Sequence, residues 1–243
     1  MDWDSIIEAY PESKEDILKA KGIREKAGEI LEGLSIPKID ISRDKDADAG
    51  ILDKDMIPVD TMAGICKELW EDMFGVFPKW DIADAIKKFI SQRHVPEVKG
   101  QNDIIVYMVI NAVVKGYMDI FRQHNKDLVP KEWREGMCPF CSSYPKTAFD
   151  SETGRTLSCA ICGYSWSFPR IKCPFCNNTD HTSLGYFEAD GIDGVRVYYC
   201  RICNHYIKVT DLRVTDAKDP ETQDILTLEM DELAIKEGFN PTS

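Results

Sequence analysis

Apolar residues in the first third of the chain recur at helical spacing. From 11 to 34 they lie three or four positions apart with charged residues between them, which predicts an amphipathic helix. The same spacing from 62 to 77 predicts a second helix, with Asp60 or Thr61 as its N-cap. Cys66 falls on the apolar face of this helix and is expected in the core, because unpaired cysteine is often buried.

Two more helices are predicted before position 130. Residues 82–90 carry a short amphipathic pattern, and residues 104–123 are apolar on several faces, which is typical of a helix in the middle of a bundle. The longest apolar run, from 104 to 110, continues after Asn111 only to 114, well short of the ~20 residues that a bilayer requires, so we expect no membrane span. Segment 35–60, with two prolines and an Asp-rich stretch, is interpreted as a solvated connector.

The pattern changes at Pro130. From there to about 216, short stretches of β-forming residues are broken by Gly, Asn and Asp. After Asp219 and Pro220 a last helix is predicted, with Leu226, Met230 and Leu233 on one side and Gly238 at the C-cap. We expect this tail to pack back onto the rest of the chain.

Composition and charge indicate a folded protein whose paired cysteines are expected to bind metal. The 243 residues, 43% of them hydrophobic, can build a core, and the net charge of −12 arises outside the β region, where charges balance. No charged segment followed by an apolar run precedes the nine cysteines, so we expect a cytoplasmic protein. In a reducing compartment, paired cysteines favour metal over disulfides.

Eight of the nine cysteines form four Cys-x-x-Cys pairs. A tight turn across each pair can bring two sulfurs to about 2.3 Å from one ion, provided that the next residue tolerates a left-handed backbone. Gly163, Asn177 and Asn204 meet that requirement well, and Ser142 less well. The alternative, disulfides or unligated thiols, fits this regular spacing poorly.

An internal repeat indicates which pairs share a metal. Cys-Pro-Phe-Cys occurs twice, each time followed by two predicted strands around a turn, at 150–154 and 190–194, and then by another pair. A hairpin between two pairs closes the shorter loop, so each repeat should be a ribbon. The first predicted site is Cys138, Cys141, Cys159 and Cys162, and the second is Cys173, Cys176, Cys200 and Cys203.

Tetrahedral sulfur ligation suits two zinc ions or two rubredoxin-type iron ions, and the ligands do not separate these metals. Four thiolates close the coordination sphere, which argues against metal-activated hydrolysis. The complete sets leave His181 and His205 as surface residues. The sequence holds no catalytic triad, phosphate loop or dinucleotide motif, so we predict a protein that is not an enzyme. Nearby basic residues are expected to offset the thiolate charge; these are Arg155, Arg170, Lys172, Arg196 and Arg201.

Several of these motifs resemble the FdhE family, the accessory proteins of formate dehydrogenase. The resemblance runs from Cys138 to Pro241, and it is carried by Cys138-Pro-Phe-Cys141-Ser-Ser-Tyr-Pro145, Leu157-Ser-Cys159-Ala-Ile-Cys162, Trp166, Arg170-Ile-Lys172-Cys173, Cys176, Leu184-Gly-Tyr186, Cys200-Arg-Ile-Cys203, Tyr206-Ile-Lys208, Leu226-Thr-Leu228-Glu-Met-Asp231-Glu-Leu233, Glu237-Gly238 and Asn240-Pro241. It implies a helical N-terminal domain, two rubredoxin-like ribbons that bind iron, and a partner in the catalytic subunit of formate dehydrogenase or a related molybdoenzyme.

Pattern, repeat and resemblance together predict an α+β fold, with an N-terminal all-α helical bundle, two tandem rubredoxin-like or zinc-ribbon β modules and a C-terminal helix. The expected domains are 1–132 (helical), 133–168 (first ribbon), 169–216 (second ribbon) and 217–243 (C-terminal helix and tail). Two other functions stay open: an electron carrier with rubredoxin-like iron, and a nucleic-acid-binding ribbon. Against the latter, such proteins carry a basic footprint, whereas every segment here is neutral or acidic, so we expect no nucleic acid partner.

Overall fold

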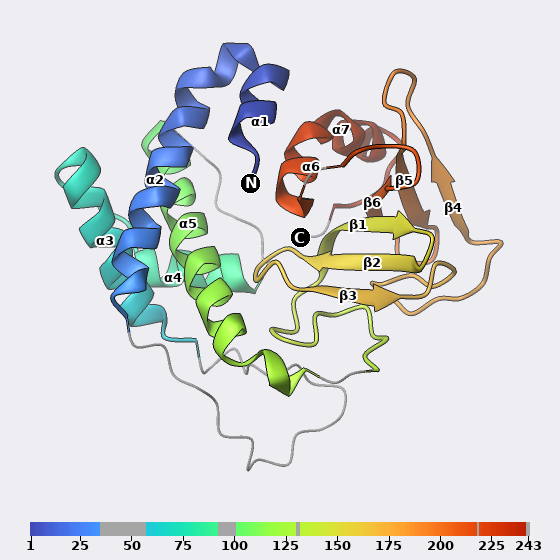
Figure 1. Ribbon diagram of the computed structural model, residues 1–243, viewed down its shortest axis with the longest axis horizontal. Coiled ribbons are helices and arrows are strands. Elements are labelled where there is room, and N and C mark those ends of the chain that lie inside the picture. Colours follow the sequence, from blue (N-terminus) through green and yellow to red (C-terminus); the bar gives the residue numbers. More distant parts are fainter. Residues whose placement is uncertain (35–56, 92–100, 130–131, 218, 242–243) are drawn as a thin grey trace. The chain divides into compact units, whose positions relative to one another are not determined.

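The computed structural model describes residues 1–34, 57–91, 101–129, 132–217 and 219–241, and the chain divides into two compact units (Figure 1). The helical unit comprises described residues 10–34 and 57–128, and the ribbon unit comprises described residues 1–9 and 129–241. The α+β class is confirmed, with helices in the N-terminal part and a β-sheet in the C-terminal part. The four domain boundaries expected from the sequence stay a prediction, and most of the connector at 35–60 lies outside the described residues.

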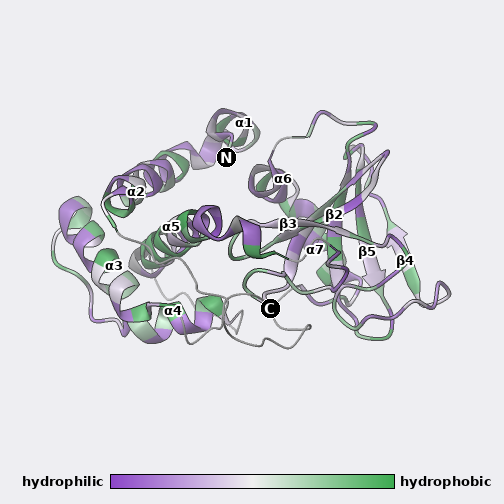
Figure 2. Ribbon diagram, turned by 60° about the horizontal axis from the view of Figure 1, so that its bottom comes forward, coloured by the Kyte–Doolittle hydropathy of each residue, from purple (hydrophilic) through white to green (hydrophobic). Residues whose placement is uncertain are grey.

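Four α-helices form the helical unit: α2 (Lys14–Glu32, after the 3-10 turn Pro11–Ser13), α3 (Val59–Phe74), α4 (Ile82–Ile90) and α5 (Gln101–His124). Hydrophobic and hydrophilic residues are interspersed along α2 (Figure 2), and its buried residues Ile23, Ala27 and Leu31 lie four positions apart. Helix α5 contacts α2, α3 and α4, which confirms its expected place in the middle of the bundle. Gly116 allows the close approach of α2, since a Cβ there would lie 2.5 Å from Leu31 Cδ1.

The start of α3 differs from the prediction. The N-cap position is Pro58, not Asp60 or Thr61, and no side chain caps the helix. Proline there presets the backbone dihedral for the chain's entry into the helix, and Asp60 falls in the first turn, where the helix dipole favours a carboxylate. Cys66 is fully buried in α3, as expected.

Helix α5 is long and apolar enough, by length and composition alone, to cross a membrane between Asp103 and His124. Half of its most apolar stretch is buried inside the structure, as in the core helix of a helical bundle. The packing of α5 on three other helices agrees with the buried helix predicted from the sequence.

The ribbon unit contains one six-stranded sheet: β1 (Pro145–Ser151), β2 (Gly154–Cys159), β3 (Ser165–Phe168), β4 (Leu184–Phe187), β5 (Val195–Cys200) and β6 (Tyr206–Asp211). The strand order is β3-β2-β1-β6-β5-β4. All neighbours are antiparallel except β1 and β6, which run parallel from the pair Thr147–Lys208 to the pair Asp150–Asp211. The two ribbons therefore share a single sheet, an arrangement that the repeat did not predict.

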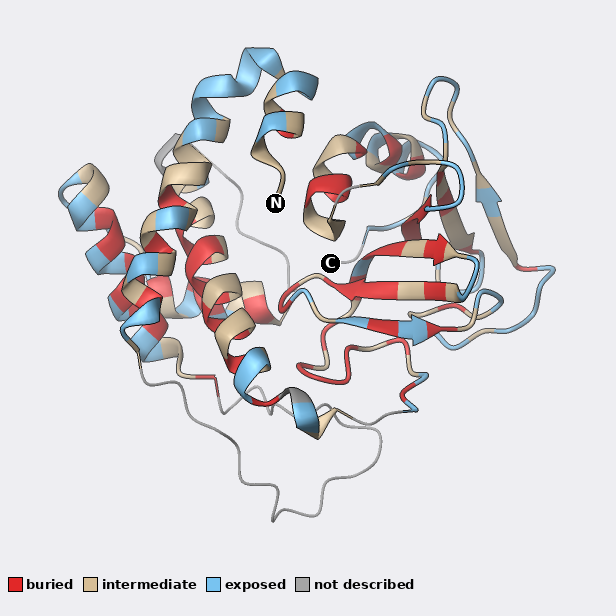
Figure 3. Cartoon of the chain, viewed as in Figure 1, coloured by how far each residue is buried: buried red, intermediate tan, exposed pale blue. Residues whose placement is uncertain are grey.

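The sheet is most buried where the ribbons join. Every residue of β6 is buried, whereas β4 at one end of the sheet has no buried residue (Figure 3). A small core on the second ribbon consists of Val195, Val197, Tyr206, Met230 and Ala234, which come from two strands and the C-terminal helix. The tail thus packs back onto the sheet, as expected.

The C-terminal helix is interrupted. It consists of α6 (Pro220–Leu226) and α7 (Leu228–Lys236), with Thr227 out of helical geometry at φ −124° and ψ 30°. A single helix was predicted because Leu226, Met230 and Leu233 keep helical spacing across the break. The C-cap of α7 is Glu237, one residue before the predicted Gly238, and Gly238 follows it in the left-handed conformation, with φ 88°. Its amide and that of Phe239 donate hydrogen bonds back into the last turn, both at 3.0 Å.

A buried lysine ties the α6–α7 junction to the sheet. Lys208 of β6 donates hydrogen bonds to the carbonyl oxygen of Asp224 (2.8 Å) and to Asp231 Oδ2 (2.6 Å). Its Nζ also lies 2.8 Å from Asp224 Oδ1, an ionic contact without hydrogen-bond geometry. Asp224 is shared with the exposed Lys146, whose Nζ lies 2.8 Å from Oδ2. Although burial by itself raises the pKa of Asp224, the two ammonium groups bring it below its usual value.

Helix α1 (Trp3–Ala9) was not predicted from the sequence, and it contacts α6. The amide of Asp2 donates to Thr222 Oγ1 at 2.7 Å, and the N-terminal ammonium lies 3.4 Å from Asp219 Oδ2. Asp219 is also the N-cap of α6, since its side chain accepts hydrogen bonds from the amides of Glu221 and Thr222. The first residues of the chain are therefore part of the ribbon unit.

Candidate metal centres

Each of the four Cys-x-x-Cys segments folds into the same turn. The carbonyl oxygen of the first cysteine accepts a hydrogen bond from the amide of the residue that follows the second cysteine, at 2.8 to 3.3 Å. That residue has a positive φ in all four turns: Ser142 (57°), Gly163 (66°), Asn177 (60°) and Asn204 (58°). The predicted left-handed positions are confirmed, including the serine, the least favourable of the four.

The turns also aim backbone amides at sulfur. The amides of Phe140, Ile161 and Phe175 each lie 3.4 Å from the Sγ of the first cysteine in their turn. Such donors stabilise a thiolate and leave the opposite side of the sulfur free for a metal. In the second cluster Asn178 Nδ2 adds a side-chain donor 3.6 Å from Cys200 Sγ.

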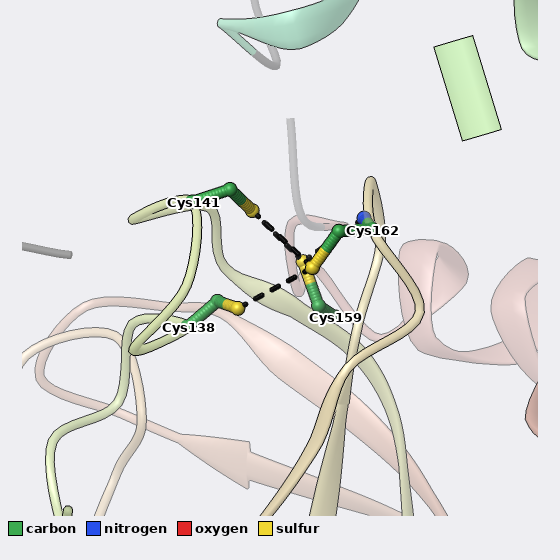
Figure 4. A group of neighbouring side chains, drawn as sticks. All are labelled: Cys138, Cys141, Cys159 and Cys162. Atoms are coloured by element: carbon green, nitrogen blue, oxygen red, sulfur yellow. Dashed lines mark hydrogen bonds between the residues drawn. The ribbon is translucent and has the colours of Figure 1, made fainter. Parts of the chain in front are cut away.

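The first cluster brings together Cys138, Cys141, Cys159 and Cys162, all buried, with their sulfurs turned toward one another (Figure 4). The sulfur–sulfur distances are 3.5 Å for Cys138–Cys162, 3.4 Å for Cys141–Cys159 and 3.6 Å for Cys141–Cys162. These are too long for disulfides and close to the edge of about 3.8 Å expected for a tetrahedron with 2.3 Å metal–sulfur bonds. The geometry therefore fits a single tetrahedral ion.

The crowding of these thiols favours a cation. Hydrogen bonds from Cys138, Cys159 and Cys162 lower the pKa of Cys141 well below its usual value. Burial raises the pKa of both Cys138 and Cys162 well above it. Four buried thiols cannot all ionise unless positive charge offsets them, and a divalent ion would supply that charge as it displaces their protons.

The second cluster brings together Cys173, Cys176, Cys200 and Cys203. The Cys173–Cys203 sulfurs lie 3.6 Å apart and the Cys176–Cys200 sulfurs 3.7 Å apart, again near the tetrahedral edge. Burial tends to raise the pKa of Cys200, but the amides of Cys203 and Ile202 bring it down to about 7. Burial raises the pKa of Cys203 to about 11.

The two groups are the sets expected from the repeat, and their role as metal ligands stays a prediction. His181 is exposed, and neither it nor His205 belongs to a cysteine cluster among the described residues. The ring of His205 lies 5.1 Å from that of Phe175, with Nδ1 2.9 Å from the carbonyl oxygen of Cys203. The histidine therefore packs beside the second cluster.

Several of the basic residues near the clusters pair with carboxylates. Arg155 is buried and makes a bidentate contact with Asp150, in which Nε donates to Oδ1 at 2.9 Å and Nη2 donates to Oδ2 at 3.0 Å. Its guanidinium group lies 4.0 Å from the centre of the Tyr198 ring. Arg196 pairs with Glu188 at 2.6 Å. Arg201 donates instead to Tyr199 Oη at 3.2 Å. That the five basic residues offset the thiolate charge stays a prediction.

Chemically, each cluster offers four sulfur ligands and no further site for water on a tetrahedral ion. Such a set suits a structural or redox metal, either zinc or iron. It does not provide the open position that metal-activated hydrolysis needs.

Known proteins resemble this chain in sequence over part of its length. Residues 171–243 match the family model described as FdhE, C-terminal domain. A Protein FdhE homolog from Aquifex aeolicus is 35% identical over 114 residues, which covers 45% of this chain and 40% of the relative. A Protein FdhE homolog from Serratia proteamaculans is 31% identical over 115 residues, which covers 44% and 35% of the two chains. The matches therefore span two fifths or less of these relatives' length.

The fold is similar over nearly the whole chain to a solved structure, the crystal structure of the FdhE protein from Pseudomonas aeruginosa. The TM-score is 0.69 at 17% identity, and the alignment covers 98% of this chain and 91% of the other. This likeness concerns the fold alone, and it extends far beyond residues 171–243, which the family model matches.

Proposed function

From its similarity to the FdhE family, we propose that this chain is a non-enzymatic accessory protein of formate dehydrogenase or of a related molybdenum enzyme. In this role it binds the catalytic subunit of that enzyme in the cytoplasm. The observation that carries the proposal is the joint occurrence of an FdhE C-terminal domain at 171–243 and two four-cysteine clusters. Both clusters lie in the ribbon unit, which also contains the family domain.

The clusters support a binding role over a catalytic one. Each would hold one zinc or iron ion with its coordination filled by thiolates, so no position is left for a substrate. The metals would instead stabilise the turns that the ribbons present to a partner, because ions of this kind contribute their binding free energy to folding.

The direct test is co-purification from the native cell. The full chain with a C-terminal tag is expected to capture the catalytic subunit of a formate dehydrogenase or related molybdoenzyme, identified by mass spectrometry. A variant with Cys138→Ser and Cys173→Ser, which removes one ligand from each cluster, should lose the capture. The matched control is Cys66→Ala, which alters a buried cysteine outside the clusters and should retain it.

Absence of any such enzyme among the captured proteins, with the chain folded and its metals bound, would refute the accessory role. Loss of formate dehydrogenase activity on deletion of the chain, restored by the wild-type chain and by Cys66→Ala, is the expected result in the cell. An unchanged formate dehydrogenase activity after deletion of the chain would count against the accessory role.

A second function, that of an electron carrier, is favoured by the exposure of Cys176 in the second cluster. Iron held by four thiolates near the surface is capable of redox chemistry. Reversible reduction of bound iron would support this role. Protein that holds only zinc, or iron that cannot be cycled, would exclude it.

A further inference from the structure

The two clusters arise from equivalent sequence motifs but differ in their access to solvent. In the first, all four cysteines are buried. In the second, Cys173 and Cys200 are buried, Cys203 is half-buried and Cys176 is exposed. One side of the second sulfur tetrahedron therefore faces solvent.

The residues between the cysteines show the same difference. The second intervening residue of each turn is buried in the first cluster, as Phe140 and Ile161. Its counterparts in the second cluster are half-buried Phe175 and Ile202, which is 66% exposed. Ile171, two residues before the first ligand, is 65% exposed. The open side is thus a property of the whole second site and does not depend on a single cysteine.

Exposure matters because a metal leaves a four-thiolate site by ligand exchange. An incoming donor must approach the ion while a cysteine sulfur departs. At the first cluster this approach requires the displacement of packed side chains, including the fully buried Phe140. At the second cluster the donor can approach beside Cys176 without such rearrangement.

We propose that the second four-cysteine cluster is an exchange site, at which a metal ion is loaded and withdrawn through Cys176, while the ion in the first cluster is held in place. The step is a substitution without electron transfer. The metal–sulfur bond of Cys176 breaks as a bond to an external thiolate or other chelating donor forms, and the released thiolate takes a proton from water. The proposal rests on the proposed function only in assuming that both clusters bind metal.

The test uses the full chain loaded with zinc. Native mass spectrometry should first show two ions per chain. On addition of an excess of the chelator EDTA, zinc is expected to leave in two phases of one ion each, with rates at least tenfold apart. N-ethylmaleimide added during the fast phase should label Cys173, Cys176, Cys200 and Cys203 before the other set, as mapped by peptide mass spectrometry.

This labelling needs no variant, so a failure to fold cannot obscure it. Cys66 provides an internal control, because it is fully buried and should stay unlabelled while the chain is folded. As matched variants, Cys176→Ser is expected to accelerate the fast phase, and Cys141→Ser, the equivalent change in the first repeat, to alter only the slow phase.

Release of both ions at one rate, or labelling of the Cys138 set first, would overturn the exchange proposal and leave the accessory role intact. A folded chain that binds no metal would overturn the exchange proposal together with the assignment of both clusters as metal sites. Capture of the partner enzyme is measured separately, so the two failures are distinguishable.

Discussion

Lys208 offers the sharpest test of how the C-terminal helices are held. Lys208→Met keeps most of the aliphatic stem but removes the ammonium group from a side chain that is 2% exposed. Asp224 and Asp231 then lose a cation that lies 2.6–2.8 Å from their carboxylates, and the Asp224 carbonyl loses its donor. Removal of one partner from a buried ion pair costs about 3–5 kcal/mol. We expect a loss of this size in the opening free energy of α6, α7 and β6.

Lys146→Met is the matched control, because Lys146 contacts the same carboxylate from the surface. Its side chain is 56% exposed, and an exposed pair contributes about 0–1 kcal/mol. Both variants are compared by native-state hydrogen exchange, which reports opening free energies locally. Adding Asp231→Asn to Lys208→Met should recover part of the loss, since it removes one unpaired carboxylate.

Equal effects of the two lysine variants, or a loss below about 1 kcal/mol for Lys208→Met, would show that burial does not strengthen this interaction. The explanation of how the tail is anchored would then fail, and the apolar contacts of Met230 and Ala234 would have to hold it alone.

Three further predictions concern other parts of the chain. Burial raises the pKa of the Cys66 thiol from 9.0 to about 12, so the contribution of the neutral thiol to the free energy of unfolding is complete below pH 9 and is lost as the pH rises toward 12. In urea unfolding, the wild-type chain should lose about 2 kcal/mol of stability between pH 9 and 10.5, and Cys66→Ala should not show this loss. Gly136→Ala should cost more than about 3 kcal/mol in thermal or urea unfolding, because its methyl group would lie 1.8 Å from the Pro174 carbonyl oxygen. Gly28→Ala is the matched control, because a methyl group there would point into open space on helix α2, and it should stabilise the chain by about 0.5–1 kcal/mol. Equal changes in stability for the two variants would show that the close contact at Gly136 does not matter. Removal of metal by a chelator should abolish the hydrogen-exchange protection of β1–β6 but not that of α2–α5, and retention of protection in the sheet would show that the clusters are not structural.

The helices that could be predicted are those with a clear apolar period. Residues 82–90 form α4 as predicted, and α5 begins three residues before the predicted start at 104. The break at Thr227 could not be predicted, because the apolar spacing continues across it and the interruption satisfies the buried Lys208. Helix α1 shows no strong period in its seven residues, and its position follows from contacts with α6, more than two hundred residues away.

The grouping of the cysteines could be derived from the sequence, because a hairpin brings the two pairs of each repeat together over a short loop. The join between the ribbons could not. The parallel pairing of β1 with β6 links residues such as Thr147 and Lys208, and no local pattern marks that register. Nor could the unequal exposure of the clusters be predicted, since both repeats begin with the same Cys-Pro-Phe-Cys segment and only tertiary packing distinguishes them.

The parallel pairing of β1 with β6 also determines which strands form the two edges of the sheet. The first strand of one repeat pairs with the third strand of the other, so the interface is heterologous, and the two surfaces in contact are different. Such a head-to-tail arrangement does not close on itself, and it leaves the complementary surfaces, β3 and β4, as outer edges to which another copy could be added. Both edge strands are only four residues long. Short edges of this kind limit pairing with a further chain, so the brevity of β3 and β4 restricts the sheet to two modules.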